Sequence, residues 1–291
     1  MKPILEVRNL TKRYGKGCPQ CLELTGADRE TNQCPRCRSV LACREVSFSL
    51  CPGEVLGIVG ESGSGKSTVV RLLHFDFEPT AGEFLLCLNG HAQEGLEPTA
   101  REAVQSGQNL FALSGFHRRQ VRNELMGIVY QNARMGLRLK VSSGGNIAER
   151  LLMAGWRHVG CMRERAAGLL VKTEVPLQRV DEPPRHFSGG MQQRVQIARA
   201  LSTHPAVLLL DEVTTGLDVS VQARVLDLIR SLQQELGIAT VVVSHDLGVI
   251  RLLTSRTLVM RHGCIVEQGL SDQILEDPQH PYTQLLVSSM L

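Results

Sequence analysis

The stretch GESGSGKS at residues 60–67 constrains the fold more than any other part of this sequence. It fits the spacing G-x-x-x-x-G-K-S and lies between an apolar run, EVLGIVG (54–60), and an amphipathic pattern, STVVRLLHF (67–75). Glycines let backbone N–H groups curl around phosphate oxygens, and the start of the following helix adds its positive dipole. This context favours a phosphate-binding loop over a flexible glycine-rich turn.

The loop supplies most of the candidate nucleotide ligands. The Lys66 ammonium can reach the β- and γ-phosphates of a nucleoside triphosphate, and the Ser67 hydroxyl can ligate Mg²⁺. We therefore expect ATP and Mg²⁺ as cofactors. The residues predicted to hold them here are Gly60, Ser62, Gly63, Gly65, Lys66, Ser67 and Thr68.

The surrounding patterns predict an α/β fold. The apolar runs AVLLLDE (206–212) and ATVVVSH (239–245) lack alternation and are typical of buried parallel strands. SVQARVLDLIRSLQQEL (220–236) has one apolar stripe and predicts a helix. Strands that alternate with helices favour a doubly wound sheet. Residues 88–125 are polar and glycine-rich, which indicates a loop-rich insertion, and 146–187 are mostly helical in pattern.

Composition argues against other classes of protein. The net charge is only +3 and aromatic residues make up 4 %, so we expect no nucleic-acid partner. No apolar run approaches the roughly 18 to 20 residues that cross a bilayer. The opening MKPILEVRNL lacks the apolar stretch of a signal peptide. These features predict a cytoplasmic protein.

Two carboxylates end one of the predicted strands. Asp211 is placed to hold Mg²⁺ through water, and Glu212 can polarise the attacking water as a general base. Acidic residues also follow strands in ordinary turns, but the phosphate-binding loop favours the catalytic interpretation.

Two Cys-Pro-x-Cys pairs interrupt the chain between the first two predicted strands. Their spacing is that of a zinc ribbon, in which four thiolates complete a closed tetrahedral site. The polar spacer, with Gly26 and Asn32 as turn formers of a short hairpin, is too poor in apolar residues to fold alone, so a metal would stabilise it. An Fe–S cluster, two disulfides or a thiol redox pair are the alternatives. The predicted zinc ligands are Cys18, Cys21, Cys34 and Cys37.

FSGGMQQRVQIARAL (187–201) resembles the signature sequence of the ABC ATPases. Ser188, Gly189 and Gly190 open a helix there, which is either an anion site or an ordinary serine cap. The resemblance implies an ABC nucleotide-binding domain, with a P-loop NTPase parallel-sheet core and a helical subdomain. It also implies a homodimer, because in this family the signature closes over the γ-phosphate of the partner subunit's ATP.

Further positions follow the same family order. The resemblance implies that Tyr14 stacks on adenine and that Gln131 contacts Mg²⁺ and the attacking water. It implies that Asp218 lies at the dimer interface and that His245 contacts the γ-phosphate. The implied catalytic residues are therefore Glu212, Gln131 and His245.

Two departures from the family pattern concern turnover. Val213 stands where the family usually has proline, and Gln131 is followed by NARMGL in place of a proline-containing continuation. We expect slower or altered hydrolysis at most. The expected organisation is a nucleotide-binding domain over 1–291, an inserted cysteine module over 15–43, a helical signature subdomain over 132–190 and a C-terminal tail over 256–291.

The segment after Gln131 and the C-terminus narrow the class. DPQHPYTQLLVSSML (277–291) resembles the tails of peptide and nickel importer ATPases and of the ABC-type subunit of the bacterial phosphonate C–P lyase system. MGLRLKVSSGGNIAERLLMAGWRHVG (135–160) favours the second group. That resemblance implies docking on the C–P lyase core complex, whose radical chemistry belongs to another subunit. An importer subunit with a membrane permease partner, and a non-catalytic binding module, are the alternatives.

Overall fold

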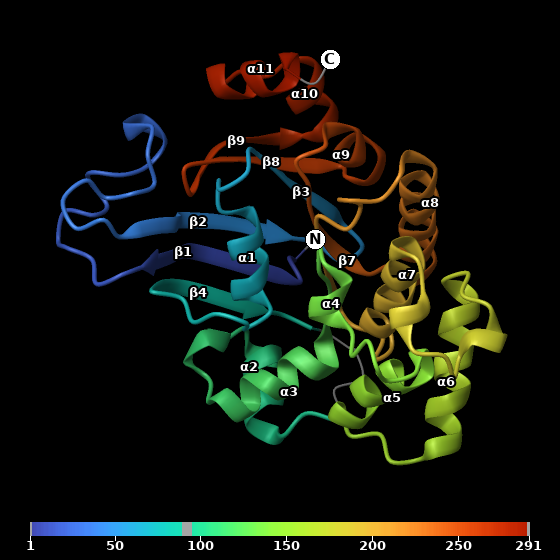
Figure 1. Cartoon of the computed structure of the whole chain (residues 1–291). Coiled ribbons are helices and arrows are strands. Elements are labelled where there is room, and N and C mark those ends of the chain that lie inside the picture. Colours follow the sequence, from blue (N-terminus) through green and yellow to red (C-terminus); the bar gives the residue numbers. More distant parts are fainter. Residues whose placement is uncertain (1, 89–94, 290–291) are drawn as a thin grey trace.

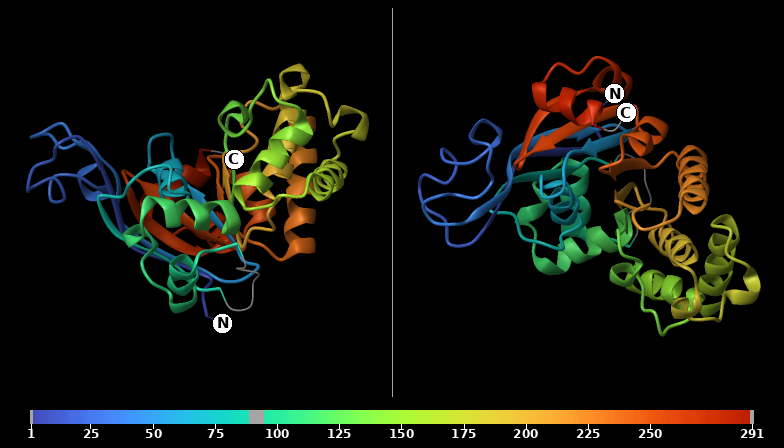
Figure 2. Two further views of the ribbon diagram at one scale, coloured as in Figure 1. Left: turned by 90° about the horizontal axis from the view of Figure 1, so that it is seen from below. Right: turned by 45° about the horizontal axis from the view of Figure 1, so that its top comes forward.

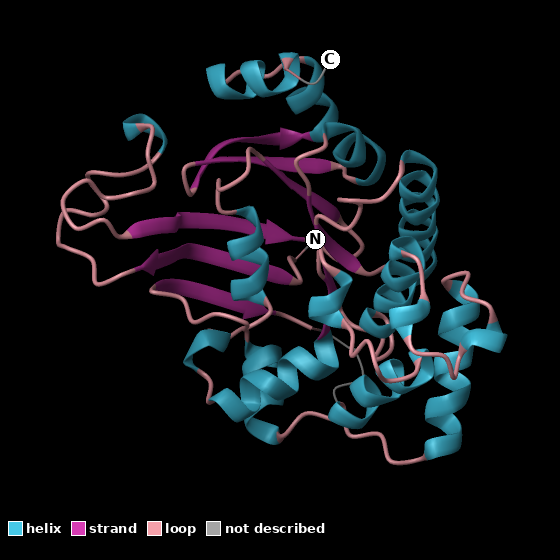
Figure 3. Cartoon of the chain, in the orientation of Figure 1, coloured by secondary structure: helices cyan, strands magenta, loops and turns pink. Residues whose placement is uncertain are grey.

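The computed structural model describes residues 2–88 and 95–289, and two β-sheets form its centre (Figures 1 and 3). The smaller sheet is antiparallel, in the order β2-β1-β4. The larger sheet has the order β5-β6-β7-β3-β8-β9, and all its pairs are parallel except β8 with β9. The strands are β1 (Leu5–Tyr14), β2 (Val40–Leu50), β3 (Val55–Val59), β4 (Ala81–Leu86), β5 (Met126–Val129), β6 (Val207–Asp211), β7 (Ala239–Val243), β8 (Arg256–Arg261) and β9 (Cys264–Leu270).

The predicted α/β class and its central elements are confirmed. The runs expected to be buried strands are β3, β6 and β7, and every residue of β6 and β7 is buried. Because successive side chains of a strand point to opposite faces, both faces of the sheet are covered along β6 and β7, which explains why these strands are apolar at consecutive positions. The two predicted helices are α1 (Lys66–Leu73) and α8 (Val219–Leu236).

The strand order brings distant motifs to one edge of the large sheet. β3 lies between β7 and β8, and β6 lies beside β7. Because these strands are parallel, their carboxyl ends meet at the same edge, where ligands bind in open α/β sheets. The segments that follow β3, β6 and β7 are therefore neighbours.

The expectation of a loop-rich insertion over 88–125 is wrong for the described part of that range. It contains two helices, α2 (Pro98–Ser106) and α3 (Gly115–Leu125), with the short turn η2 (Leu110–Ala112) between them. The buried stripe of α2 consists of two alanines and one valine, so its hydrophobic signal is weak. Residues 89–94 lie outside the described residues.

The cysteine module and the helical subdomain lie at opposite ends of the molecule (Figures 1 and 2). The cysteine module extends from the ends of β1 and β2, drawn in blue. The range 132–190, expected to be the helical subdomain, contains the predicted helical segment. Its elements are α4 (Ala133–Gly136), α5 (Ser143–Met153), α6 (Val159–Lys172), η3 (Leu177–Arg179), η4 (Pro184–His186) and the start of α7 (Gly189–Ala200).

The range 256–291, expected to be a tail, includes two strands of the large sheet, β8 and β9. Beyond them lie α10 (Ser271–Glu276) and α11 (Pro281–Ser288), while α9 (Leu247–Leu253) precedes them. Tyr282 and Leu286 of α11 are buried in the core. Among the described residues, no helix combines the length and apolar character needed to cross a bilayer.

Candidate nucleotide-binding and catalytic site

The loop after β3 has the conformation that its glycines permit. Gly60, Gly63 and Gly65 have φ of 147°, 83° and 108°, in a region that side-chain-bearing residues rarely adopt. A Cβ on Gly60 would lie 2.1 Å from the Met260 carbonyl oxygen, and one on Gly65 would lie 2.0 Å from that of Ala42. The loop is thus pressed against two other backbone segments.

The Lys66 ammonium group is hydrogen-bonded to the backbone of the phosphate-binding loop. The buried Nζ donates to the carbonyl oxygens of Gly60 and Glu61, at 2.7 and 2.8 Å. Desolvation lowers the pKa of Lys66 below its usual value, while the carboxylates of Glu212 and Asp211 oppose that shift. A cation is therefore held beside the N-terminus of α1, where the helix dipole also attracts anions.

Ser67 and Asp211 join the loop to the end of β6. The Ser67 hydroxyl donates to Asp211 Oδ1 at 2.6 Å, and Arg71 Nε lies 3.9 Å from Oδ2. Burial raises the pKa of Asp211, and the bond from Ser67 counteracts this. These hydroxyl and carboxylate oxygens, with the Gln131 amide oxygen as a third candidate, are the hard ligands that Mg²⁺ prefers.

Three side chains from different parts of the chain lie around the Glu212 carboxylate. Its Oε2 accepts from Gln131 Nε2 at 3.1 Å and from the Thr215 hydroxyl at 3.2 Å, and it lies 3.3 Å from His245 Nδ1. The structure therefore brings the three residues predicted to be catalytic together. Glu212 has a φ of 48°, a strained backbone of the kind found at functional sites. Thr215 was not foreseen, although it stands in the TTGLD stretch that follows.

Tyr14 ends β1 close to the start of α1. Its ring is 41 % exposed, meets Phe77 edge to face at 6.2 Å and has Lys12 Nζ 5.1 Å from its centroid. Burial of the hydroxyl raises the pKa of Tyr14, while a hydrogen bond with the Thr68 side chain lowers it. An exposed ring thus lies next to the phosphate-binding loop, and stacking on adenine stays a prediction.

Ser188 and Asp218 cap the helices that follow them. Ser188 Oγ accepts from the Met191 N–H at 3.4 Å, at the start of α7. Asp218 Oδ1 accepts from the Val221 N–H at 3.0 Å, at the start of α8, and a bond from Ser220 lowers the pKa of Asp218. α7 lies apart from α1 (Figure 1), so one chain does not place this cap over its own phosphate-binding loop. Roles for both in a dimer remain predictions.

Gly189 and Gly190 form the first turn of α7. A Cβ on Gly190 would lie 2.3 Å from Val221 Cγ1, so glycine allows α7 to approach α8 closely. At Gly189 the nearest atom is Leu217 Cδ2, at an ordinary 3.5 Å. Gly190 therefore has a packing role whether or not the turn binds an anion.

Two residues that contact the outside of the phosphate-binding loop were missed. The Glu61 N–H donates to the Tyr282 hydroxyl at 3.0 Å, and Asn32 Nδ2 donates to the Gly63 carbonyl at 3.3 Å. They come from α11 and from the cysteine module. No sequence spacing reveals such contacts, because they depend on the tertiary fold.

The four cysteines of the module lie in one cluster. Their sulfur atoms all lie within 4.8 Å of one another, and the closest pairs are 3.4 to 3.7 Å apart. A tetrahedral zinc with Zn–S bonds of about 2.3 Å separates its sulfurs by about 3.8 Å, whereas a disulfide needs about 2.05 Å. Hydrogen bonds from the hydroxyl and backbone of Ser39 lower the pKa of Cys37 to about 6. The Cys18 N–H lowers the pKa of Cys21, but burial and the neighbouring thiols raise it to about 12. The cluster therefore fits a four-thiolate metal site.

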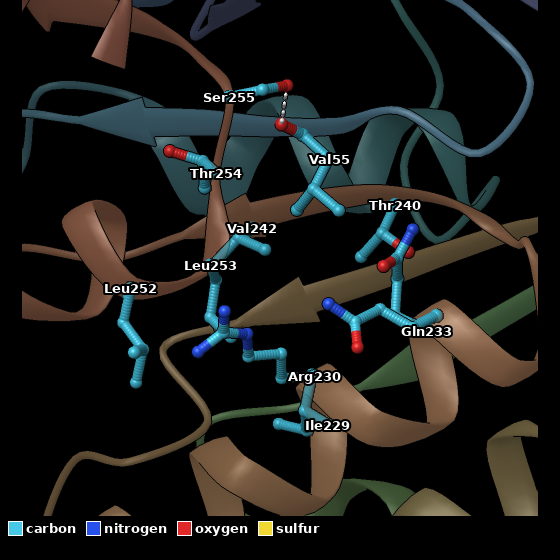
Figure 4. Close-up of a pocket in the computed structure, with 11 residues that line it drawn as sticks. Val55, Ile229, Arg230, Gln233, Thr240, Val242, Leu252, Leu253, Thr254 and Ser255 are labelled. Atoms are coloured by element: carbon cyan, nitrogen blue, oxygen red, sulfur yellow. Dashed lines mark hydrogen bonds between the residues drawn. The ribbon is translucent and has the colours of Figure 1, made fainter. Parts of the chain in front are cut away.

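A separate hollow of about 230 Å³ lies among α8, β3, β7 and the segment after α9 (Figure 4). Val55 and Thr240, which line it, stand at the amino ends of their strands. The phosphate-binding loop follows the opposite end of β3. The hollow is therefore distinct from the nucleotide site, and Arg230 is the one charged residue among the described residues that line it.

The site and fold together define the class of this protein. The ABC transporter family profile matches residues 43–215, and the chain belongs to this family of ATP-hydrolysing P-loop domains. The chain is 46 % identical over its full length to the putative phosphonates utilization ATP-binding protein PhnK of Escherichia coli, covering 98 % of that protein.

Importer ATPases and a solved cassette are also similar. The dipeptide transport ATP-binding protein DppF of Escherichia coli is 38 % identical over 87 % of this chain and 70 % of DppF. The dimeric structure of the ATP-binding cassette MJ0796 bound to ADP and Pi superposes with a TM-score of 0.71. It is 25 % identical and covers 92 % of this chain and 98 % of that one.

Proposed function

We propose that this chain is the ATP-hydrolysing subunit that docks on the phosphonate C–P lyase core complex in the cytoplasm and supports organophosphonate breakdown. The observation that supports this proposal most strongly is the similarity to PhnK, which is 46 % identical over this whole chain and over 98 % of PhnK. The importer ATPase DppF matches at 38 % and over only 70 % of its length.

A chromosomal Lys66→Ala strain tests the biological role. We expect it to lose growth on methylphosphonate as sole phosphorus source and to keep growth on inorganic phosphate, because Lys66 holds the phosphate-binding loop. A tagged wild-type chain should co-purify with the C–P lyase core. Normal growth of the Lys66→Ala strain on methylphosphonate would refute the proposal.

The importer function is the second candidate, favoured by the similarity to DppF. It requires a permease pair in the membrane, which would bind the helical subdomain. Membrane fractionation distinguishes the two functions. Recovery of the chain with membrane permeases, and with no lyase subunit, would favour the importer.

The proposed hydrolysis follows from the contacts around Glu212. Bound Mg²⁺ would neutralise phosphate charge between Ser67 and Asp211. Glu212 would accept the proton of a water whose oxygen bonds to the γ-phosphorus as the bond from that phosphorus to the bridging oxygen of ADP breaks. Gln131, which donates to Glu212 Oε2, and His245, 3.3 Å from it, would orient the water and the γ-phosphate. Lys66 would hold the β- and γ-phosphates through its ammonium group.

The second half of each active site is proposed to come from another copy of the chain. Ser188, Gly189 and Gly190 open α7, away from the loop of their own subunit, and Asp218 begins α8 next to them. In a head-to-tail dimer this helix start would face the partner's γ-phosphate. The dimeric MJ0796 cassette supports this arrangement.

The cysteine module is proposed to bind one zinc ion per chain. Elemental analysis of protein purified without added metal should give one zinc per chain, and the double variant Cys18→Ser, Cys21→Ser should give none, because two ligands cannot complete the site. Cys161→Ser and Cys87→Ser, at two exposed cysteines elsewhere, are the matched control. Iron with visible absorbance would replace this proposal with an Fe–S cluster.

A further inference from the structure

We propose that the metal-loaded cysteine module clamps the phosphate-binding loop, so that metal occupancy raises the affinity of the chain for MgATP. This inference rests on the zinc site proposed above. The clamp is the Asn32 amide, which joins the module to the Gly63 carbonyl. Regulation of nucleotide binding through the module is a function separate from docking.

Asn32 is held at both ends. Its backbone carbonyl accepts from the Leu41 N–H of β2 at 2.7 Å, and its side chain donates to Gly63 at 3.3 Å. The C=O and N–H of a trans peptide point in opposite directions. A donor on the Gly63 carbonyl therefore helps to fix the peptide that carries the Ser64 N–H, which donates to the Glu61 carbonyl at 3.1 Å and closes the turn of the phosphate-binding loop.

The base of the module also presses on the loop through β2. Leu41 packs against Cys21 and Cys34 in the small apolar cluster of the module. One residue further on, the Ala42 carbonyl oxygen lies only 2.0 Å from the position that a Cβ on Gly65 would take. The Leu41 side chain thus links the position of the cysteines to the strand that supports the loop.

A second, weaker series of contacts connects the cysteine module to the phosphate-binding loop through Arg261 and Tyr282. Arg261 lies 3.4 Å from the Glu30 carboxylate and 4.9 Å from the Tyr282 ring centroid, and the Tyr282 hydroxyl accepts from Glu61. Glu30 is 76 % exposed, so this ion pair contributes little by itself. Asn32 is therefore the contact to test.

The metal matters because the module, besides its turn hydrogen bonds, has only a very small apolar core. Its buried apolar cluster consists of two of the cysteines and Leu41, with the other two cysteines and Leu24 packed against them. A segment with so small a core stays ordered through its metal. Asn32, two positions before Cys34, loses its fixed place when the four thiolates are no longer held together.

The experiment measures binding of the nonhydrolysable analogue AMP-PNP with Mg²⁺ to the full chain, zinc-loaded and after zinc removal. We expect zinc removal to weaken binding about three- to tenfold, the effect of one lost hydrogen bond. Zinc-loaded Asn32→Ala should weaken binding to a similar extent while keeping one zinc per chain. In that variant, zinc removal should have a smaller further effect. Gln20→Ala is the matched control, because Gln20 bonds Arg36 within the module.

The outcomes separate the inference from the proposals on which it rests. Equal affinity of zinc-loaded wild type and Asn32→Ala overturns the clamp and leaves the zinc site intact. Equal affinity with and without zinc overturns it too. A chain that binds nucleotide but no metal overturns both the zinc site and the clamp. Failure to co-purify with the C–P lyase core affects neither.

Discussion

Glu212→Gln should reduce the rate of ATP hydrolysis about 10²- to 10⁴-fold, the usual contribution of a general base, and should leave MgATP binding nearly unchanged. Glutamine keeps an oxygen that accepts from Gln131 and Thr215, but it cannot take a proton from the attacking water. Phosphate release in steady state and AMP-PNP binding measure the two effects.

Thr215→Ala is the control for this experiment. It removes one hydrogen bond to the same carboxylate oxygen and keeps the base, so we expect less than about a tenfold loss of rate. A Glu212→Gln chain that retains more than about a tenth of the wild-type rate would show that the proton goes elsewhere. A wild-type chain with no turnover would favour the non-catalytic binding module.

Gly65→Ala should abolish MgATP binding and lower the free energy of unfolding by about 2 to 4 kcal/mol, the range of a strained backbone combined with a steric clash. Gly65 has a φ of 108°, and the new Cβ would lie 2.0 Å from the backbone oxygen of Ala42. Neither β2 nor the loop can move without disturbing the other. Urea unfolding with an unchanged m value measures the loss.

Two other glycines serve as graded controls. Gly63 has a φ of 83° but no atom within 4 Å of an added Cβ. Gly63→Ala should therefore lower the free energy of unfolding only by the backbone strain, about 1 to 3 kcal/mol. Gly168 lies inside α6 with free space around it, and Gly168→Ala should stabilise by about 0.5 to 1 kcal/mol. If all three variants unfolded at the same urea concentration, the clash argument would fail.

The sequence predicted those elements whose apolar pattern is strong and regular. β6 and β7 are buried along their whole length, and α8 has a wide apolar face, so their patterns are unambiguous. The sequence did not predict α2, because its buried face consists of alanine and valine, whose weak apolar pattern is hard to detect in a polar, glycine-rich segment. A weak apolar stripe identifies a helix only when the sheet on which it packs is known.

The candidate site likewise has one part that the sequence predicts and another that depends on the tertiary fold. The phosphate-binding loop could be predicted because its glycines, lysine and serine act within eight consecutive positions. Tyr282 and Asn32 contact that loop from 221 and 31 positions away. Such contacts depend on strand order and on the path of the inserted module, and neither is encoded in a local pattern.

The place of β3 in the large sheet also bears on biosynthesis. The strand that carries the phosphate-binding loop pairs with β7 and β8, and Val55 lies opposite Thr240. At about 5 to 20 residues per second, a ribosome that has completed β3 needs about 10 to 40 seconds more to reach β7, the first strand with which β3 pairs. During that interval the nascent strand has no partner within its sheet, and His245, which follows β7 and lies beside Glu212, has not yet been synthesised.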